Sequence, residues 1–190
     1  MFEIQQAPLP GCKLLLPILR EDPRGRFVKT FHAEFFSANG MADVYREQYY
    51  SVSSNSVLRG LHFQVPPHDN AKLVTCLAGE IFDVLLDLRT GSPTFGRHAR
   101  FKLSGGRGEL LYIPSGIAHG FYVHSETATV LYGASTVYAP QHDAGVRWDS
   151  AGIPWPHAAP LVSERDAALT TFSEFKSPFR FSEIPARARV

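Results

Sequence analysis

The side chains of this sequence that could move protons near neutral pH are spread from residue 62 to residue 166. They are His62, Lys72, His119, Tyr132 and Tyr138, with Asp166 as a candidate orienting carboxylate. Histidine is the natural base near neutral pH, and a tyrosine hydroxyl can deliver a proton to the opposite face of a substrate. Strand histidines and tyrosines more often serve packing, and lysines are usually solvated. Residue types alone therefore indicate acid–base chemistry and leave a structural role open.

The sharpest local pattern joins a tight turn to one of these histidines. It is Gly108-x5-Pro114-x-Gly116-x2-His119, which predicts a strand, a Pro/Gly corner and a second strand whose first inward side chain is His119. The pattern resembles the second signature of the cupin superfamily, a double-stranded β-helix with a pocket inside the barrel. Pro-x-Gly turns are common, so the motif alone leaves an ordinary turn equally open.

A metal-binding cupin also carries two histidines at a spacing of two, plus a carboxylate, because this spacing places both imidazoles on one face of a strand. The corresponding stretch here is RGLHFQ (59–64), and Gln64 stands where the second histidine should be. His62 and His119 alone are too few ligands for a metal site. The sequence therefore predicts a pocket without a metal. A metal-dependent cupin oxygenase or isomerase stays as an alternative, which metal analysis of the purified protein would decide.

Short alternating stretches predict the strands that would position these groups. In residues 81–88, apolar residues at 82, 84, 86 and 88 share one face while Asp83 and Asp87 fall on the other, which predicts a half-buried strand. If residues 57–65 are extended, the side chains at 58, 60, 62 and 64 lie on one side. Further strands are expected at 72–77, 109–113, 119–124 and 129–138.

Turn signals separate these strands, and 15 glycines with 14 prolines suit many short strands. Helices are expected only at 33–42 and in a short turn that begins at Ser163. We predict an all-β fold of the cupin type, a jelly-roll barrel with an N-terminal strand arm and short C-terminal helical segments. One domain would span 1–190, with a core of about 23–150 and a C-terminal arm at 151–190.

Composition excludes several classes of protein. The formal net charge of +1 gives no general field for nucleic acid or an anionic membrane. No apolar run approaches the roughly 18 residues of a membrane span, and the first residues lack the basic region of a signal peptide. Cys12 and Cys76 form no zinc or CxxC pattern, so reduced thiols in a cytoplasmic protein are expected.

Several motifs in one order and spacing resemble a nucleotide-sugar epimerase family. They are RGLHFQ (59–64), KLV (72–74), GE-x-FDV-x-x-DLR-x-GSPTFG (79–96), YIP-x-G-x-AHGF (112–121), LY (131–132), YAP (138–140) and WD (148–149). The chain is similar here to the dTDP-4-dehydrorhamnose 3,5-epimerase family, from about Pro23 to Asp166. The resemblance implies a homodimeric cupin without metal or other cofactor, acting on a nucleoside-diphospho-4-keto-6-deoxy sugar.

The resemblance also implies roles for individual residues. His62 matches the family's base, Asp166 the aspartate that holds that imidazole, Lys72 the lysine near the C4 ketone and Tyr132 the proton donor. Further matches would contact the substrate within the pocket: Arg59, His119 and Tyr138. Arg24 and Phe27, in DPRGRF (22–27), would come from the partner subunit and hold the nucleotide.

The chain departs from the family pattern at three expected substrate contacts. The usual Gln-x-Asn-x-Ser-x-Ser approach to the first motif is here EQYYSVS (47–53), which changes the contacts of Glu47 and Tyr49. Lys29 stands where the family commonly has a glutamate that accepts the thymine N3 proton, and an ammonium can only donate. A base with an acceptor at that edge, such as cytosine, therefore becomes an alternative. Gly133 and Gln141 also replace a common lysine and glutamate.

The default hypothesis is 3,5-epimerisation of a dTDP-4-keto-6-deoxyhexose. Close variants are epimerisation at C3 or C5 alone and a CDP-linked substrate. A different class of function, a catalytically silent cupin that binds or senses a nucleotide sugar, is disfavoured by the joint presence of the base, lysine, tyrosine and orienting aspartate, since binding alone would not demand all four.

Overall fold

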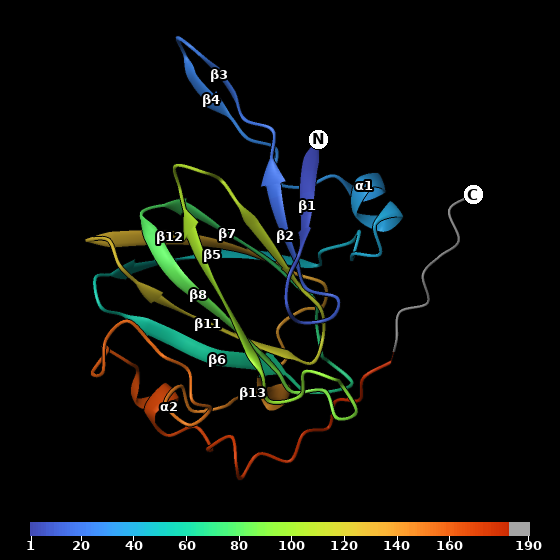
Figure 1. Ribbon diagram of the computed structural model, residues 1–190, viewed down its shortest axis with the longest axis vertical. Coiled ribbons are helices and arrows are strands. Elements are labelled where there is room, and N and C mark those ends of the chain that lie inside the picture. Colours follow the sequence, from blue (N-terminus) through green and yellow to red (C-terminus); the bar gives the residue numbers. More distant parts are fainter. Residues whose placement is uncertain (183–190) are drawn as a thin grey trace.

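The computed structural model describes residues 1–182 and folds them into two facing β-sheets with a projecting hairpin (Figure 1). The strands are β1 (Phe2–Gln6), β2 (Lys13–Pro17), β3 (Arg20–Asp22), β4 (Gly25–Phe27), β5 (Glu47–Ser54), β6 (Leu58–Gln64), β7 (Lys72–Ala78), β8 (Glu80–Asp87), β9 (His98–Ser104), β10 (Leu110–Ile113), β11 (Ile117–Val123), β12 (Thr127–Ala134) and β13 (Asp143–Gly145). The helices are α1 (Ala33–Ala38), a 3₁₀ turn (Pro140–His142) and α2 (Glu164–Ala167).

The order of the strands identifies the architecture. One sheet has the order β1-β2-β10-β7-β12-β5 and the other β13-β6-β11-β8-β9. From β5 to β13, successive strands alternate between the two sheets except at the β8–β9 hairpin. This alternation with antiparallel pairing is that of a double-sheet jelly roll. The predicted all-β jelly-roll fold is confirmed.

The main core lies between the two sheets. Val74, Cys76 and Val130 point inward from the six-stranded sheet, and Leu85 and Phe121 meet them from the five-stranded sheet. Because side chains alternate along a strand with a period of two, the inward face of β7 that carries residues 74 and 76 also carries the lysine at position 72. At that end of the sheets, the apolar core gives way to a polar pocket.

The strand at 80–87 is buried on both faces, so the prediction of a half-buried strand is wrong. Its face with Val84 and Leu86 packs against residues 151–182, including Trp155 and Phe179. Asp83 lies on the opposite face, fully buried. The local alternation was correct, but the face expected in solvent points into the space between the sheets, because the C-terminal arm covers the other one.

A register shift in β6 corrects the expected alternation of residues 58, 60, 62 and 64. His62 pairs with His119 and Arg59 pairs with Phe121, so between these pairs two residues of β6 oppose one residue of β11. Arg59 and His62 consequently line one pocket. The backbone is close-packed here: Gly60 has a φ of 137°, and a Cβ on it would lie 2.5 Å from the Cα of Gly120.

The other predicted elements are present with shifted ends. The strand expected at 129–138 ends at Ala134, because Val137 and Ala139 hydrogen-bond to the side chain of Gln64 on β6 instead of continuing the ladder. The helix expected at 33–42 ends at Ala38, and Ser163 caps α2 by accepting the backbone N–H of Asp166. Strands β1 to β4 form the predicted N-terminal strand arm, whereas no strand was predicted at the positions of β5, β9 and β13. No helix within residues 1–182 is long and apolar enough to span a membrane.

Candidate active site

A cavity of about 500 Å³ opens between the two sheets. Its lining residues are Glu47, Gln48, Tyr49, Arg59, His62, Phe63, Gln64, Asn70, Lys72, His119, Phe121, Tyr132, Ala134, Tyr138, Asp143 and Arg165. Eight of the twelve predicted site residues are among them, and a ninth, Asp166, lies directly behind His62. The pocket therefore gathers side chains from β5, β6, β7, β11 and β12, which are far apart in the sequence.

His62 and Asp166 form a closely coupled pair. The Nε2 atom of His62 lies 2.6 Å from Oδ1 of the buried Asp166, whose Oδ2 accepts the Gly60 N–H at 3.2 Å. Burial alone would raise the pKa of Asp166, but the hydrogen bond and charge of His62, with the Gly60 N–H, outweigh burial and lower it. An ionised carboxylate can only accept, so the shared proton resides on Nε2 and the neutral ring keeps Nδ1 free to take a proton.

Lys72 brings a positive charge into the same cavity. Its Nζ donates to the backbone carbonyl of His62 at 3.1 Å. Burial lowers the pKa of Lys72 to about 8, and the carboxylates of Asp143 and Asp83 offset only part of that effect. Lys72 is therefore mostly an ammonium at neutral pH, close to the histidine that could act as a base.

His119 belongs to a second histidine–aspartate pair that the sequence did not reveal. Its Nε2 lies 2.8 Å from Oδ2 of Asp83, and both residues are buried. Burial raises the pKa of Asp83, while His119 and Lys72 oppose this shift. The Oδ1 atom of Asp83 has no hydrogen-bond partner among the described residues. The only signal for Asp83 was its place in the alternation of β8, which suggested solvent.

Tyr132 lies deep in the pocket as a neutral phenol. It is buried, and burial raises the pKa of its hydroxyl above the usual value, with Asp83 and Tyr49 adding to the shift. It therefore keeps its proton at neutral pH and can donate it. The ring of Tyr49 stacks on it, and the ring of His119 lies edge-on to it at 6.1 Å. Arg59 also lines the cavity and is held by a 2.9 Å bond from Nε to Ser53.

A polar network closes one side of the pocket mouth. The hydroxyl of Tyr138 and a guanidinium nitrogen of Arg165 both donate to Oδ2 of Asp143, at 3.0 and 2.7 Å. The backbone N–H of Tyr138 donates to Glu47 at 3.0 Å. Sequence reasoning included Tyr138 and Glu47 but missed Asp143 and Arg165, although Arg165 directly precedes Asp166 on α2.

Gln64 occupies the position where a metal-binding cupin has its second histidine. Its side chain hydrogen-bonds to the backbone of nearby loops. Its Nε2 donates to the carbonyls of His68 and Val137 at 2.8 and 3.3 Å, and its Oε1 accepts the Ala139 N–H at 2.6 Å. Within residues 1–182, no group of three or more His, Cys, Asp or Glu residues has the arrangement of a metal site.

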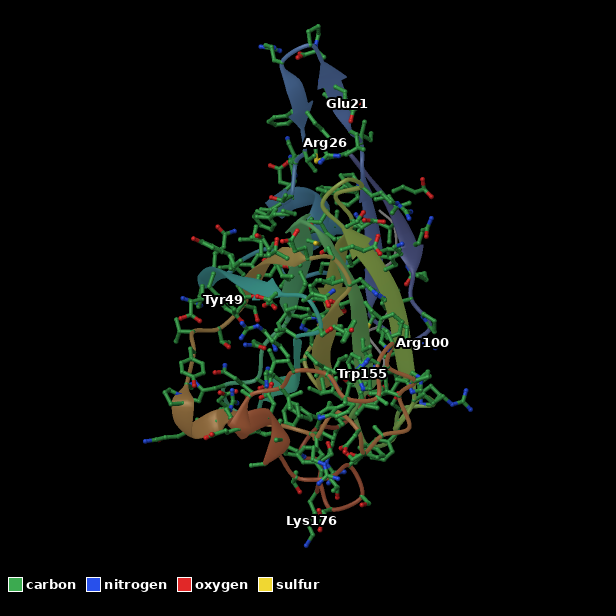
Figure 2. All side chains as sticks on the ribbon, turned by 90° about the vertical axis from the view of Figure 1, so that its left-hand side faces the viewer. Glu21, Arg26, Tyr49, Arg100, Trp155 and Lys176 are labelled. Atoms are coloured by element: carbon green, nitrogen blue, oxygen red, sulfur yellow. The ribbon has the colours of Figure 1, made fainter. Side chains whose placement is uncertain are left out.

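Three predicted substrate contacts lie outside this pocket. Arg24 and Phe27 are on the β3–β4 hairpin, and Lys29 follows it, next to Ile18 and Phe27. Figure 2 shows the hairpin, marked by Glu21 and Arg26, well apart from Tyr49 at the pocket. Arg24 instead pairs with Asp22 of its own hairpin at 2.6 Å. Within one chain, the structure does not bring these three residues to the site.

The cavity thus combines a base, a cation and a phenol. A histidine oriented by a carboxylate can remove a proton, a buried ammonium can stabilise a developing oxyanion, and a neutral tyrosine can return a proton. This set suits proton abstraction from a carbon next to a carbonyl group, followed by reprotonation.

Comparison with known proteins agrees with this chemistry. The family model described as dTDP-4-dehydrorhamnose 3,5-epimerase matches residues 6–174. The chain is 40% identical over 193 residues to the dTDP-4-dehydrorhamnose 3,5-epimerase of Neisseria gonorrhoeae, an alignment that covers all of this chain and 58% of that relative. The chain therefore spans less than two thirds of the length of this relative.

Two solved structures are similar over most of their length. One is the dTDP-6-deoxy-D-glucose-3,5-epimerase of Legionella pneumophila, in complex with dTDP-4-keto-L-rhamnose, with a TM-score of 0.91, 34% identity and coverage of 96% of this chain and 100% of that one. The other is a 3′-monoepimerase from Streptomyces bikiniensis, in complex with dTDP-quinovose, with a TM-score of 0.82, 32% identity and coverage of 87% and 86%. Fold, pocket and comparisons agree: the chain belongs to the dTDP-4-dehydrorhamnose 3,5-epimerase family.

Proposed function

We propose that the chain is a 3,5-epimerase of a dTDP-linked 4-keto-6-deoxy sugar, used in the synthesis of a deoxysugar. The observation that carries the proposal is the convergence of the His62–Asp166 pair, Lys72 and Tyr132 on one cavity. A protein that only bound a nucleotide sugar would need neither an oriented base nor a buried ammonium beside it. The ligand of the Legionella pneumophila structure, dTDP-4-keto-L-rhamnose, supports the substrate class.

The first step is removal of a proton by His62. Hydrogens on C3 and C5 are acidic because both carbons flank the C4 ketone. Nδ1 of His62 takes the proton, the C–H electron pair forms a C=C bond, and the carbonyl electrons move to the C4 oxygen. Asp166 holds the ring in the tautomer that has Nδ1 free, and its charge stabilises the imidazolium that forms.

The enolate is stabilised by Lys72. Negative charge develops on the C4 oxygen, and an ammonium in a pocket of low dielectric constant stabilises that charge more strongly than water would. The bond from Lys72 to the backbone of His62 fixes the cation beside the base. The ammonium is therefore already in position when negative charge develops on the C4 oxygen.

The second step is reprotonation from the opposite face by Tyr132. The phenol O–H bond breaks, a new C–H bond forms at the enolate carbon, and the ketone is restored with its configuration inverted. His62 is left with one extra proton and Tyr132 with one fewer, and exchange with water resets both. The reaction is redox-neutral and a repeat at the other carbon gives the 3,5-epimer, so we propose no cofactor.

The nucleotide is proposed to be held with the help of a second copy of the chain. Both strands of the β3–β4 hairpin are exposed, and Ile18 and Phe27 expose apolar surface beside it. The outer face of the six-stranded sheet exposes Tyr50, Val52 and Leu77. A homodimer that buries these apolar surfaces could bring Arg24 and Phe27 of each hairpin to the other subunit's pocket. A monomer by sedimentation, under conditions where the protein is folded, would contradict this arrangement.

Both cysteines are free thiols buried in the core, which supports a place in a reducing compartment, the cytoplasm.

The identity of the base is tested through Lys29. Its ammonium can donate to the O2 or N3 atoms of cytosine but cannot accept the imide proton of thymine. The experiment compares kcat/KM for dTDP- and CDP-linked 4-keto-6-deoxyglucose in wild type and in Lys29→Glu. If Lys29 contacts the base, the substitution shifts preference toward dTDP by roughly 10- to 100-fold. An unchanged preference would show that Lys29 does not contact it.

A single-centre epimerase is the second candidate, favoured by the similarity to a 3′-monoepimerase. Product analysis by NMR separates the two, because inversion at C3 alone, at C5 alone and at both carbons gives different ring couplings. If the protein turns over neither the dTDP-linked nor the CDP-linked sugar, the proposed epimerase activity is wrong.

A further inference from the structure

Tyr49 and Tyr132 form a stacked pair inside the pocket. They are direct cross-strand partners on β5 and β12, so their side chains leave the same face of the sheet. Their ring centroids are 4.9 Å apart and their planes differ by 18°. Both rings line the cavity, with Tyr132 7% exposed and Tyr49 45% exposed. Tyr49 therefore lies on the mouth side of Tyr132.

Two aromatic contacts of Tyr132 restrict how its ring can move. Tyr49 covers one flat side of the ring, and His119 lies nearly perpendicular to it, at 71° and 6.1 Å. β5 is the edge strand of its sheet, so no further strand lies beyond Tyr49 in that direction. Without Tyr49, the face of Tyr132 on the mouth side would be open and the ring would be free to tilt outward.

The direction of the Tyr132 hydroxyl matters because proton transfer to carbon depends on alignment. A displacement of about 1 Å can cost about 100-fold in rate. An enolate that meets a misplaced donor is reprotonated by the His62 imidazolium on the original face. Once that imidazolium has exchanged its proton with the solvent, this return labels the carbon but restores the starting configuration. The position of the Tyr132 ring thus decides between inversion and return.

We propose that Tyr49 is a positioning residue for inversion: by stacking on Tyr132 it holds the phenol where it can protonate the far face of the enolate. This inference rests on the proposed function, in which Tyr132 is the donor. Tyr49 itself needs no contact with the reacting carbon. This role requires the ring of Tyr49 but not its hydroxyl. Phenylalanine at position 49 should therefore preserve the positioning of Tyr132, and alanine should not.

The experiment measures two rates in D₂O with dTDP-4-keto-6-deoxyglucose: solvent deuterium incorporation at C3 and C5, and accumulation of inverted product. The variants are Tyr49→Phe and Tyr49→Ala. Phe95→Ala is the matched control, because Phe95 is also 45% exposed and packs on another aromatic ring, Phe172, but lies outside the pocket. Thermal unfolding and KM are recorded for every variant.

The expected result is a fall in the ratio of inversion to exchange of roughly 10- to 100-fold in Tyr49→Ala, with exchange largely kept. Tyr49→Phe and the control should keep the wild-type ratio. An equal loss of exchange and inversion in Tyr49→Ala would show that Tyr49 only binds substrate, and an unchanged ratio would show that the stack has no role. Both results overturn the inference and leave the proposed function intact, whereas a wild-type enzyme with neither exchange nor inversion overturns both.

Discussion

His62 and His119 are direct partners across β6 and β11, and the Nε2 atom of each ring lies within hydrogen-bond distance of a different buried aspartate. The carboxylates come from different elements, Asp166 from α2 and Asp83 from β8. Neither Nδ1 has a hydrogen-bond partner among the described residues. Two imidazoles of defined orientation therefore stand side by side in the wall of one pocket.

His62→Ala should abolish epimerisation while leaving the fold intact. Removing a general base typically costs about 10²- to 10⁴-fold in rate, and no other side chain in the pocket combines a free imidazole nitrogen with the Asp166 contact. Deuterium exchange at C3 and C5 measures the loss. His157→Ala, at an exposed histidine outside the pocket, is the control. Near-normal exchange in the His62 variant would show that another group is the base.

The pH dependence should reveal Lys72. Its pKa of about 8 predicts that kcat/KM falls as the pH rises through 8, because the ammonium that stabilises the enolate is lost. Lys72→Arg keeps a charge that cannot be titrated in this range. The falling limb should therefore move to higher pH in that variant, whatever its absolute rate. If kcat/KM of Lys72→Arg still falls near pH 8, a group other than Lys72 causes the fall.

The same lysine should lower the stability of the fold. Its folded pKa lies below the ordinary 10.5, so between about pH 8 and 10.5 the unfolded state binds more protons and stability rises with pH. Below pH 8, the partly buried charge costs up to about 3 kcal/mol. Lys72→Met should then raise the free energy of unfolding at pH 7 by about 1–3 kcal/mol while activity falls. Denaturant unfolding measures this, and a destabilised variant would contradict it.

Asp83→Asn should impair catalysis even though residue 83 does not line the pocket. The amide removes a charge that His119 and Lys72 both face, and its NH₂ group can force His119 into the other tautomer. Loss of one charged hydrogen bond predicts a fall in kcat/KM of roughly 10- to 100-fold. Wild-type kinetics in a folded variant would show that the pair serves packing alone.

The sequence predicted the site residues that lie within recognisable motifs, but it did not predict the irregularity in β6. His62, Lys72, His119 and Tyr132 lie together as expected. The prediction of which β6 side chains share a face was wrong, because the strand has one extra residue between Arg59 and His62. Strict alternation with a period of two cannot reveal such an insertion.

The missed residues have a different cause. Asp83 looked solvent-facing because local alternation gives the two faces of a strand without showing what covers each one. The C-terminal arm, more than 60 residues away in sequence, buries the outer face of β8 and so leaves Asp83 inside. Asp143 and Arg165 meet only through the return of α2 to the pocket, a long-range contact with no local signal.

Comparing wild type with Tyr132→Phe in D₂O separates proton abstraction by His62 from far-face protonation by Tyr132. We predict deuterium incorporation with inversion in the wild type. In Tyr132→Phe we predict incorporation that persists while inverted product fails to accumulate. His62 still abstracts a proton, its imidazolium exchanges that proton with D₂O and returns deuterium to the same face, and only the far-face donor is gone. Loss of exchange together with inversion, or inversion at the wild-type rate, would contradict the division of labour between His62 and Tyr132.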